Sequence, residues 1–265
     1  MRIVIKALLL ACLPGLGLAQ DSGLKPLETI DSARDWMAVG RLDIDGAGFC
    51  TGALVAPDLV LTAAHCLFKR ASDERIDLSR IEFLAGWRKG RASAYRSASR
   101  AAIHPGYKHQ EEISAQRVRN DVALIQLDRP IRNTTILPFA TGSHPDRGAD
   151  VGIVSYAQDR ADAPSLQRAC SVMARQQGIL VMSCDIDFGS SGAPVFSFQD
   201  GTPRIVSVVS AKAEADGGRV ALGAGLEASL AMLRAELVAD SDTGQVKRAP
   251  NRIKSGSTSA KFIKP

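Results

Sequence analysis

The sequence predicts an all-β protein made of barrels or sandwiches, with one helix close to its C-terminal end. Short apolar or β-branched runs recur along the chain. Turn signals separate these runs, for example Pro57-Asp58, Pro105-Gly106 and Asp200-Gly201. Many short strands with frequent turns are typical of barrels and sandwiches. The length of 265 residues accommodates one large domain or two small ones with a proper core.

Each expected strand is short, rich in apolar or β-branched residues and bounded by turn residues. The expected strands are residues 38–44, 59–62, 81–84, 121–127, 151–156, 178–182, 195–198 and 205–210. One clear helical pattern follows at residues 226–238 (LEASLAMLRAELV), a segment rich in strong helix formers.

The first 19 residues have the layout of a secretory signal peptide. Arg2 and Lys6 flank an apolar run, and the small residues Gly17 and Ala19 precede the expected cleavage site. The run is too short for a membrane span, which needs about 20 apolar residues, and no later stretch is long and apolar enough. The sequence therefore predicts an exported protein, secreted or periplasmic. Residues 20–35 are a candidate short pro-segment.

The charge balance argues against a nucleic-acid partner. The whole chain carries a net charge of +5, and removal of residues 1–19 leaves 31 basic against 28 acidic residues, a net charge of +3. Residues 241–265 are expected to form a disordered basic tail, because residues 243–265 hold six Lys or Arg and no acid. This tail is either simply solvated or in contact with an anionic surface.

Four cysteines remain after removal of the signal peptide, which contains Cys12. They are Cys50, Cys66, Cys170 and Cys184. An even number of cysteines in an exported chain predicts two disulfides, and the sequence alone leaves three pairings open. No HxH, HExxH or CxxC spacing occurs, so no metal site is expected.

Three stretches carry residue types suited to acyl transfer. In DFGSSGAPV, residues 187–195, the glycines indicate a tight turn that holds Ser191 near bare N–H groups, although many such turns carry no chemistry. In TAAHC, His65 follows a buried-looking strand and is a candidate general base. In NDVALIQL, Asp121 is either a strand-start residue or a buried partner for an imidazole N–H.

The three residues occur in the order His65, Asp121, Ser191, which is the chain order of the chymotrypsin type. Together with TAAHC, NDVALIQL and GSSGAP, this order resembles the trypsin/chymotrypsin-like serine peptidase family over residues 36–238. The resemblance implies two six-stranded antiparallel β-barrels with a C-terminal helix. Residues 36–140 would form the N-terminal barrel, and residues 141–240 the C-terminal barrel and the helix.

The resemblance also implies a role for each matching residue. Ser191 would be the nucleophile, His65 its general base and Asp121 the residue that orients His65. The N–H groups of Gly189 and Ser191 would form the oxyanion hole, and no cofactor would be needed. Ser210 would support Asp121 and line the strand that binds the substrate. The disulfides would pair as follows: Cys50 with Cys66, and Cys170 with Cys184.

One departure places the chain nearer to the bacterial glutamyl-endopeptidase (V8-like) branch. The digestive and clotting enzymes carry GDSGGP, whose aspartate receives a new N-terminal ammonium after zymogen cleavage. Here Ser190 stands in that place and cannot form the ion pair. No IVGG-like N-terminus is found near residues 30–34. That mode of activation is therefore not expected.

The sequence leaves the substrate preference open. Asp185 is the ungapped match to the pocket-floor aspartate of trypsin, which favours cleavage after Arg or Lys, but it is also consistent with a simple loop residue. Lys212, close after Ser210, favours acidic side chains instead. We expect an exported serine endopeptidase that acts on protein or peptide substrates through an acyl-enzyme. The alternatives are a catalytically silent binding protein of the same fold and an esterase-like hydrolase with the same triad.

Overall fold

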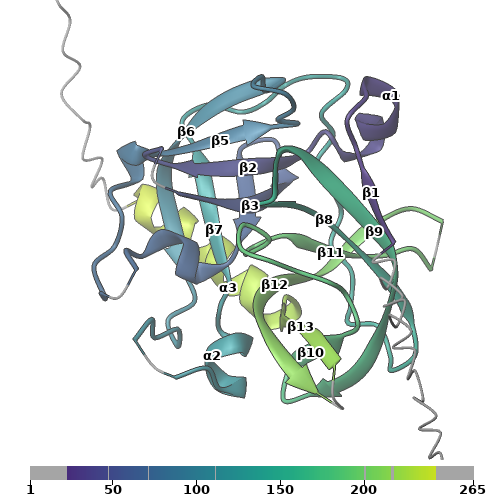
Figure 1. Cartoon of the computed structure of the whole chain (residues 1–265). Coiled ribbons are helices and arrows are strands. Elements are labelled where there is room, and N and C mark those ends of the chain that lie inside the picture. The colour runs from purple at the N-terminus through teal and green to yellow at the C-terminus, as the bar shows by residue number, and fades with distance from the viewer. Residues whose placement is uncertain are drawn as a thin grey trace, which may run out of the picture.

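The computed structural model describes residues 23–242 except residues 47, 71, 111, 200, 216 and 217. The predicted signal peptide at residues 1–19 and residues 243–265 of the predicted basic tail lie outside the described residues. Figure 1 shows two adjoining β-structures, the first coloured purple to teal and the second green. No described helix is long and apolar enough to cross a membrane.

The first β-structure is a closed antiparallel barrel. Its strands follow one another around the barrel in the order β2-β3-β4-β7-β6-β5. The strands are β2 (Val39–Ile44), β3 (Gly48–Ala56), β4 (Leu59–Thr62), β5 (Ile81–Ala85), β6 (Ala94–Ile103) and β7 (Ala123–Leu127). Closure removes every free strand edge, which protects the sheet from pairing with another chain.

The second barrel also contains six strands, in the order β8-β9-β10-β13-β12-β11. The strand β9 is 17 residues long, so it pairs with β10 through one part and with β8 through another, and this second pairing closes the barrel. The strands are β8 (Asp150–Ala157), β9 (Arg160–Gln176), β10 (Ile179–Met182), β11 (Pro194–Ser197), β12 (Arg204–Ala215) and β13 (Gly218–Gly225). The predicted fold class, two six-stranded antiparallel barrels with a C-terminal helix, is confirmed.

Aromatic side chains fill the space where the two barrels meet. The Trp36 ring, just before β2, lies 5.0 Å from the Phe196 ring in β11 of the second barrel. The Phe139 ring, in the segment between the barrels, lies 4.7 Å from Phe196. All three side chains are buried. Because buried aromatic rings contribute large apolar areas, this cluster stabilises one arrangement of the barrels.

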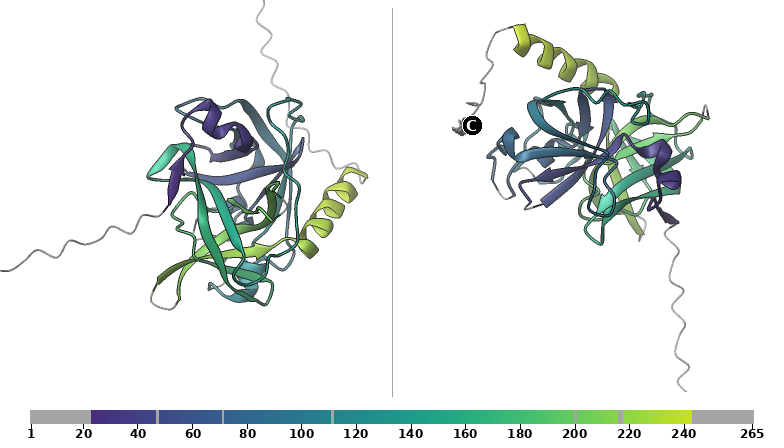
Figure 2. Two further views of the ribbon diagram at one scale, coloured as in Figure 1. Left: turned by 90° about the vertical axis from the view of Figure 1, so that its right-hand side faces the viewer. Right: turned by 90° about the horizontal axis from the view of Figure 1, so that it is seen from above.

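Short elements complete the molecule at both ends. The strand β1 (Leu24–Pro26) adds to the outside of β9, and the single helical turn α1 (Ile30–Ala33) follows it. These residues lie within the predicted pro-segment at residues 20–35, and they pack on the folded body. The short helix α2 (Ala115–Arg119) precedes β7. The C-terminal helix α3 (Glu227–Asp242) packs along β6 and β7 of the first barrel (Figure 2).

Candidate active site

His65 lies in a 3₁₀ turn, Ala64–Leu67, directly after β4. The neighbouring Cys66 forms a disulfide with Cys50 in β3, with a Cα–Cα distance of 6.2 Å. This bond ties the turn to the barrel wall. His65, Cys50 and Cys66 place three metal-ligating atoms close together, but the disulfide occupies both sulfurs.

Asp121 holds His65 through two hydrogen bonds. The His65 backbone N–H donates to Asp121 Oδ1 at 2.8 Å, and His65 Nδ1 lies 2.7 Å from Asp121 Oδ2. Asp121 is only 3% exposed. Burial would raise the pKa of Asp121, but the His65 charge and the hydrogen bonds from His65 and Ser210 outweigh burial and lower it. Asp121 is therefore a carboxylate at neutral pH, and it fixes the orientation of the ring.

Ser210 reaches the same carboxylate because of an irregularity in β12. In the pairing of β12 with β13, Val209 faces Gly223 and Ala211 faces Leu222, so Ser210 is an extra residue without a partner. Such a bulge redirects a side chain out of the regular alternation. The Ser210 hydroxyl donates to Asp121 Oδ2 at 2.5 Å.

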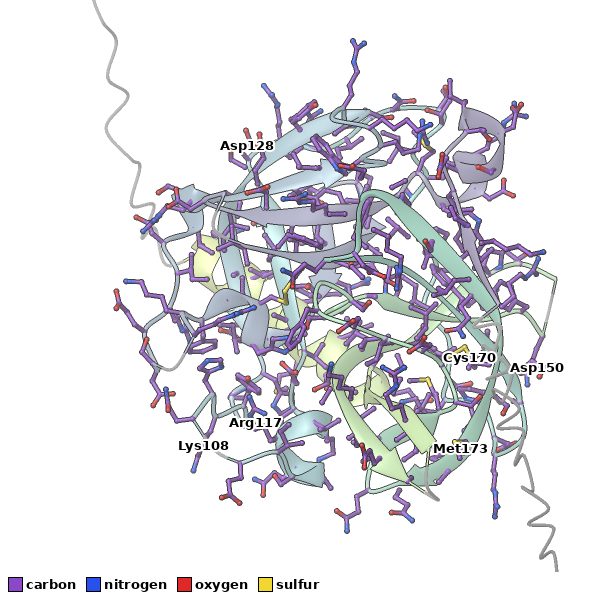
Figure 3. The ribbon with its side chains drawn as sticks, in the orientation of Figure 1. Lys108, Arg117, Asp128, Asp150, Cys170 and Met173 are labelled. Carbon is purple, nitrogen blue, oxygen red and sulfur yellow. A yellow bond between two sulfur atoms is a disulfide. The ribbon has the colours of Figure 1, made fainter. Side chains whose placement is uncertain are left out.

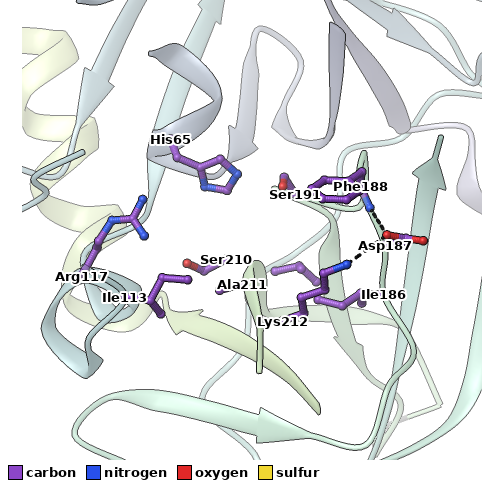
Figure 4. A pocket seen from close by; sticks show the side chains of 11 residues that line it. His65, Ile113, Arg117, Ile186, Asp187, Phe188, Ser191, Ser210, Ala211 and Lys212 are labelled. Atoms are coloured by element: carbon purple, nitrogen blue, oxygen red, sulfur yellow. Dashed lines mark hydrogen bonds and ion pairs between the residues drawn. The ribbon is translucent and has the colours of Figure 1, made fainter. Parts of the chain in front are cut away.

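Ser191 lies in the loop before β11 and faces the His65 ring across a shared cavity (Figure 4). No hydrogen bond joins Ser191 Oγ to the His65 ring in the described part of the chain. Catalytic hydrogen bonds are often long in unliganded enzymes and tighten when the substrate binds. The loop itself is fixed by Gly192, whose N–H donates to the Val209 carbonyl at 2.8 Å.

Two backbone N–H groups of this loop, those of Gly189 and Ser191, make no hydrogen bond within the described part of the chain. The Phe188 carbonyl accepts from the Gln158 N–H at 2.7 Å, and the Ser190 carbonyl accepts from the Ala193 N–H at 3.0 Å. In a trans peptide the C=O and the following N–H point in opposite directions. The N–H groups of Gly189 and Ser191 are therefore directed away from these partners, and neither has an acceptor among the described residues.

Thr51, in β3 of the first barrel, connects that barrel to the loop of the second. Its N–H donates to the Ser191 carbonyl at 2.9 Å, and its hydroxyl donates to the Gly189 carbonyl at 2.8 Å. The same hydroxyl accepts from the Tyr156 N–H at 3.1 Å. Sequence analysis did not identify Thr51, because its contacts join segments far apart in the chain.

Two cavities meet at His65 and Ser191. The first has a volume of about 300 Å³ and lies between the loop and β12. Its lining includes the predicted substrate-binding residues Ser210 and Lys212, but not Asp185. Asp185 is half-buried, and its N–H donates to Gln167 Oε1. The remaining lining residues are Ile113, Arg117, Ile186, Asp187, Phe188, Val209 and Ala211. Of these, Asp187 and Phe188 lie in the loop singled out from the sequence, and the others were not predicted as site residues.

The charges in the first cavity are mostly positive. Lys212 Nζ lies 3.3 Å from Asp187 Oδ1 and 4.5 Å from the centre of the exposed Phe188 ring. Hydrogen bonds from the Phe188 N–H and from Lys212 lower the pKa of Asp187. Arg117 also lines the cavity, and its Nε is buried with no hydrogen-bond acceptor among the described residues. The cavity thus holds two cations and one carboxylate between apolar walls.

The second cavity lies on the other side of His65 and Ser191. It has a volume of about 590 Å³. Phe49, Phe68 and the Cys50–Cys66 disulfide contribute apolar surface to it, and its charged residues are Asp45, Lys69, Arg70 and Arg80. His65 and Ser191 therefore have open space on both sides.

The remaining predicted site residues are the second cysteine pair, and they lie apart from the cavities. Cys170 in β9 forms a disulfide with Cys184, with a Cα–Cα distance of 4.9 Å. Figure 3 labels Cys170 within the second barrel. This bond links β9 to the segment that leads into the loop of Ser191.

Comparison with known proteins gives a consistent family assignment. Residues 50–204, more than half of the chain, match the model of the trypsin-like peptidase domain. Human granzyme M is 32% identical over 148 residues, which is 54% of this chain and 52% of that protein. Trypsin-1 of Salmo salar is 33% identical over 96 residues, which is 36% of this chain and 35% of that protein. The matched part of the chain thus spans about half or less of the length of these relatives.

Among solved structures, a Glu endopeptidase crystallised in complex with MPD superposes with a TM-score of 0.68. The superposition covers 83% of this chain and 98% of that one. The sequence identity is 20%, so this likeness supports the fold alone.

Proposed function

The chain belongs to the family of trypsin-like peptidase domains, and we propose that it is an exported serine endopeptidase. The observation that carries the proposal is the buried Asp121 carboxylate, which holds His65 toward Ser191 by two hydrogen bonds. Export is supported by two disulfides, since disulfides persist mainly in oxidising compartments.

In the acylation step, Ser191 Oγ attacks the carbonyl carbon of the scissile peptide bond while His65 Nε2 takes the hydroxyl proton. Asp121 stabilises the resulting imidazolium. The oxyanion of the tetrahedral intermediate accepts hydrogen bonds from the N–H groups of Gly189 and Ser191. His65 then gives its proton to the leaving amine, the C–N bond breaks, and an acyl-enzyme on Ser191 remains.

In the deacylation step, a water molecule attacks the acyl-enzyme and gives its proton to His65. The ester bond to Ser191 breaks, and His65 returns the proton to Ser191 Oγ. The two cavities suit an endopeptidase, because a long substrate needs space on the acyl side and on the leaving-group side of the scissile bond.

The charges in the first cavity favour an acidic side chain on the acyl side of the scissile bond. Lys212 and Arg117 outnumber Asp187 there, and Asp185 lies outside the lining. We expect Lys212→Glu to lower the ratio of kcat/KM values for Glu over Lys substrates at least about tenfold, a change of about 1.4 kcal/mol. Paired fluorogenic peptides that differ only in that residue measure the ratio.

Lys25→Glu is the matched control for this experiment, because Lys25 is an exposed residue of β1 that lines neither cavity. Its ratio should equal that of the unmodified chain. An unchanged ratio in Lys212→Glu would show that the cavity charge does not select the substrate.

The test of the proposed function is labelling of the purified protein with a fluorophosphonate, which reacts with activated serine hydroxyls. The unmodified chain and Ser143→Ala, which changes an exposed serine outside both cavities, should be labelled. Ser191→Ala should not be labelled. Circular dichroism of all three proteins checks that they are folded.

The result also separates the alternatives. A folded chain that is not labelled would support a catalytically silent binding protein. Labelling without cleavage of a peptide library, together with hydrolysis of ester substrates, would support an esterase. Labelling at Ser191 with cleavage of internal peptide bonds would support the endopeptidase.

A further inference from the structure

The loop of Ser191 rests on a buried pair of hydroxyl groups. Ser190, the residue before Ser191, is 0% exposed, and its hydroxyl donates toward Ser155 Oγ and the Tyr156 carbonyl, each at 3.3 Å. Ser155 is also buried. Ser190 is uncharged, so this contact orients the loop through hydrogen bonds and forms no ion pair.

A cation from the neighbouring strand bonds to the same serine that Ser190 contacts. Arg160, the first residue of β9, donates from Nη1 to the Ser155 carbonyl at 2.9 Å and to Ser155 Oγ at 3.2 Å. Its side chain is only 17% exposed. The Arg160 guanidinium therefore contacts the same Ser155 hydroxyl that Ser190 contacts.

Burial lowers the pKa of Arg160, and three acids near the loop oppose that shift. Its guanidinium interacts electrostatically with the carboxylates of Asp159, Asp185 and Asp187. Asp185 and Asp187 both belong to the segment that leads into Ser191. Removal of the cation would take one electrostatic partner from these acids and both Arg160 hydrogen bonds from Ser155.

The hairpin that carries Arg160 also orients the oxyanion-hole peptide. Ala157 pairs with Arg160, so Gln158 and Asp159 form the tight turn between β8 and β9. The Gln158 N–H is the donor that holds the Phe188 carbonyl. A shift of this hairpin would therefore rotate the Phe188–Gly189 peptide and turn the Gly189 N–H away from the reacting carbonyl.

We propose that Arg160 is a permanent positioning residue, which holds the loop of Gly189 to Ser191 in its competent form without an ammonium group from a processed N-terminus. This inference rests on the proposed peptidase function. The course of the N-terminal segment agrees with it. Leu24–Pro26 pair with the outer edge of β9, opposite Gln167 to Ser165, and Leu27 is buried. Among the described residues, no hydrogen bond joins residues 24–27 to Ser190.

The first test replaces Arg160 with methionine, which keeps the length of the side chain but removes its charge and its donors. We expect kcat on a fluorogenic peptide to fall about 10²-fold, as when one oxyanion-hole donor is lost, while KM changes less than about threefold. Arg175→Met is the matched control on the same strand, because Arg175 is half exposed and makes a long ion pair, 4.0 Å, with the exposed Asp146. It should retain the kcat of the unmodified chain.

Arg160→Lys keeps the charge with a single donor group, and it addresses the case in which Arg160→Met does not fold. We expect its kcat to lie between those of the unmodified chain and Arg160→Met, at an unchanged thermal midpoint. Full kcat in Arg160→Met would overturn the proposal. A loss explained entirely by a smaller folded fraction, measured by circular dichroism, would overturn it too.

The second test adds two residues to the N-terminus of the purified chain. Unchanged kcat is expected, since the positioning cation is internal. A large loss of kcat on extension would show that a free terminus is required, and it would overturn the proposal.

The labelling experiment distinguishes failure of this inference from failure of the proposed function. If the unmodified chain is not labelled at Ser191, the proposed function fails. If it is labelled and Arg160→Met is equally active, only this inference fails.

Discussion

Asp121→Asn is expected to lower kcat about 10⁴-fold while the protein remains folded. The carboxylate accepts from the His65 N–H, His65 Nδ1 and Ser210 Oγ. An asparagine keeps one acceptor oxygen and presents an N–H₂ group where another acceptor is needed. His65 must then present the wrong tautomer or turn its ring, and in either case Nε2 no longer accepts the proton of Ser191.

Steady-state kinetics on a fluorogenic peptide, with circular dichroism in parallel, measure this effect. Asp128→Asn is the control, since its nearest cation is the exposed Arg129 at 4.0 Å and it lies outside both cavities. If Asp121→Asn keeps more than about a tenth of the activity, Asp121 does not orient the base.

The lowered pKa of Asp121 restricts the pH range in which this residue affects the stability of the fold. Its pKa in the folded state is lower than its ordinary value. Its ionised form therefore stabilises the fold fully above the unfolded pKa of about 3.9, and that stabilisation is lost as the pH falls through the folded pKa. A loss of stability above about pH 5 must come from other groups.

Gly192→Ala is expected to destabilise the fold by about 3 kcal/mol and to remove most of the activity. Gly192 has a φ of +74°, which an L-residue adopts only with strain. A Cβ there would overlap Thr62 Oγ1 and lie 2.5 Å from the Thr51 carbonyl oxygen. The loop would have to move away from the first barrel and take Ser191 with it.

Gly201→Ala separates the effect of backbone strain from the effect of the steric overlap. Gly201 has nearly the same φ, +73°, but no atom lies within 4 Å of an added Cβ. We expect it to lose only about 1 kcal/mol and no activity. Urea unfolding and peptide hydrolysis of both variants make the comparison, and equal effects in the two would mean that the overlap with Thr62 is relieved.

The strands that the sequence predicted are rich in apolar residues, but four barrel strands, β3, β6, β9 and β13, were not predicted. The prediction for residues 59–62 coincides with β4, and residues 151–156 lie within β8. By contrast, β6 reads AYRSASRAAI, and β9 contains Pro164 and several charged residues. Their strand conformation comes from pairing with neighbouring strands rather than from their own propensity, so it was not predicted.

The site residues that could be predicted are those that stand in a local sequence motif. His65, Asp121 and Ser191 stand in recognisable motifs and a recognisable order. Thr51 does not, because the residue that it contacts, Gly189, lies 138 positions away. Arg160 was missed because a lone arginine after a turn is ordinary in sequence, and only the folded hairpin places it against Ser155.

The division of the site between the barrels has a consequence for the order of events during synthesis. His65 and Asp121 lie beside strands of the first barrel, whose last strand ends at Leu127, whereas Ser191 belongs to the second barrel. Since domains generally fold as units from the N-terminal side, the growing chain first displays His65 and Asp121 without Ser191. Under the proposed function, hydrolysis can begin only after the second barrel has folded and its loop has bonded to Thr51, so the unfinished chain would not cleave neighbouring proteins.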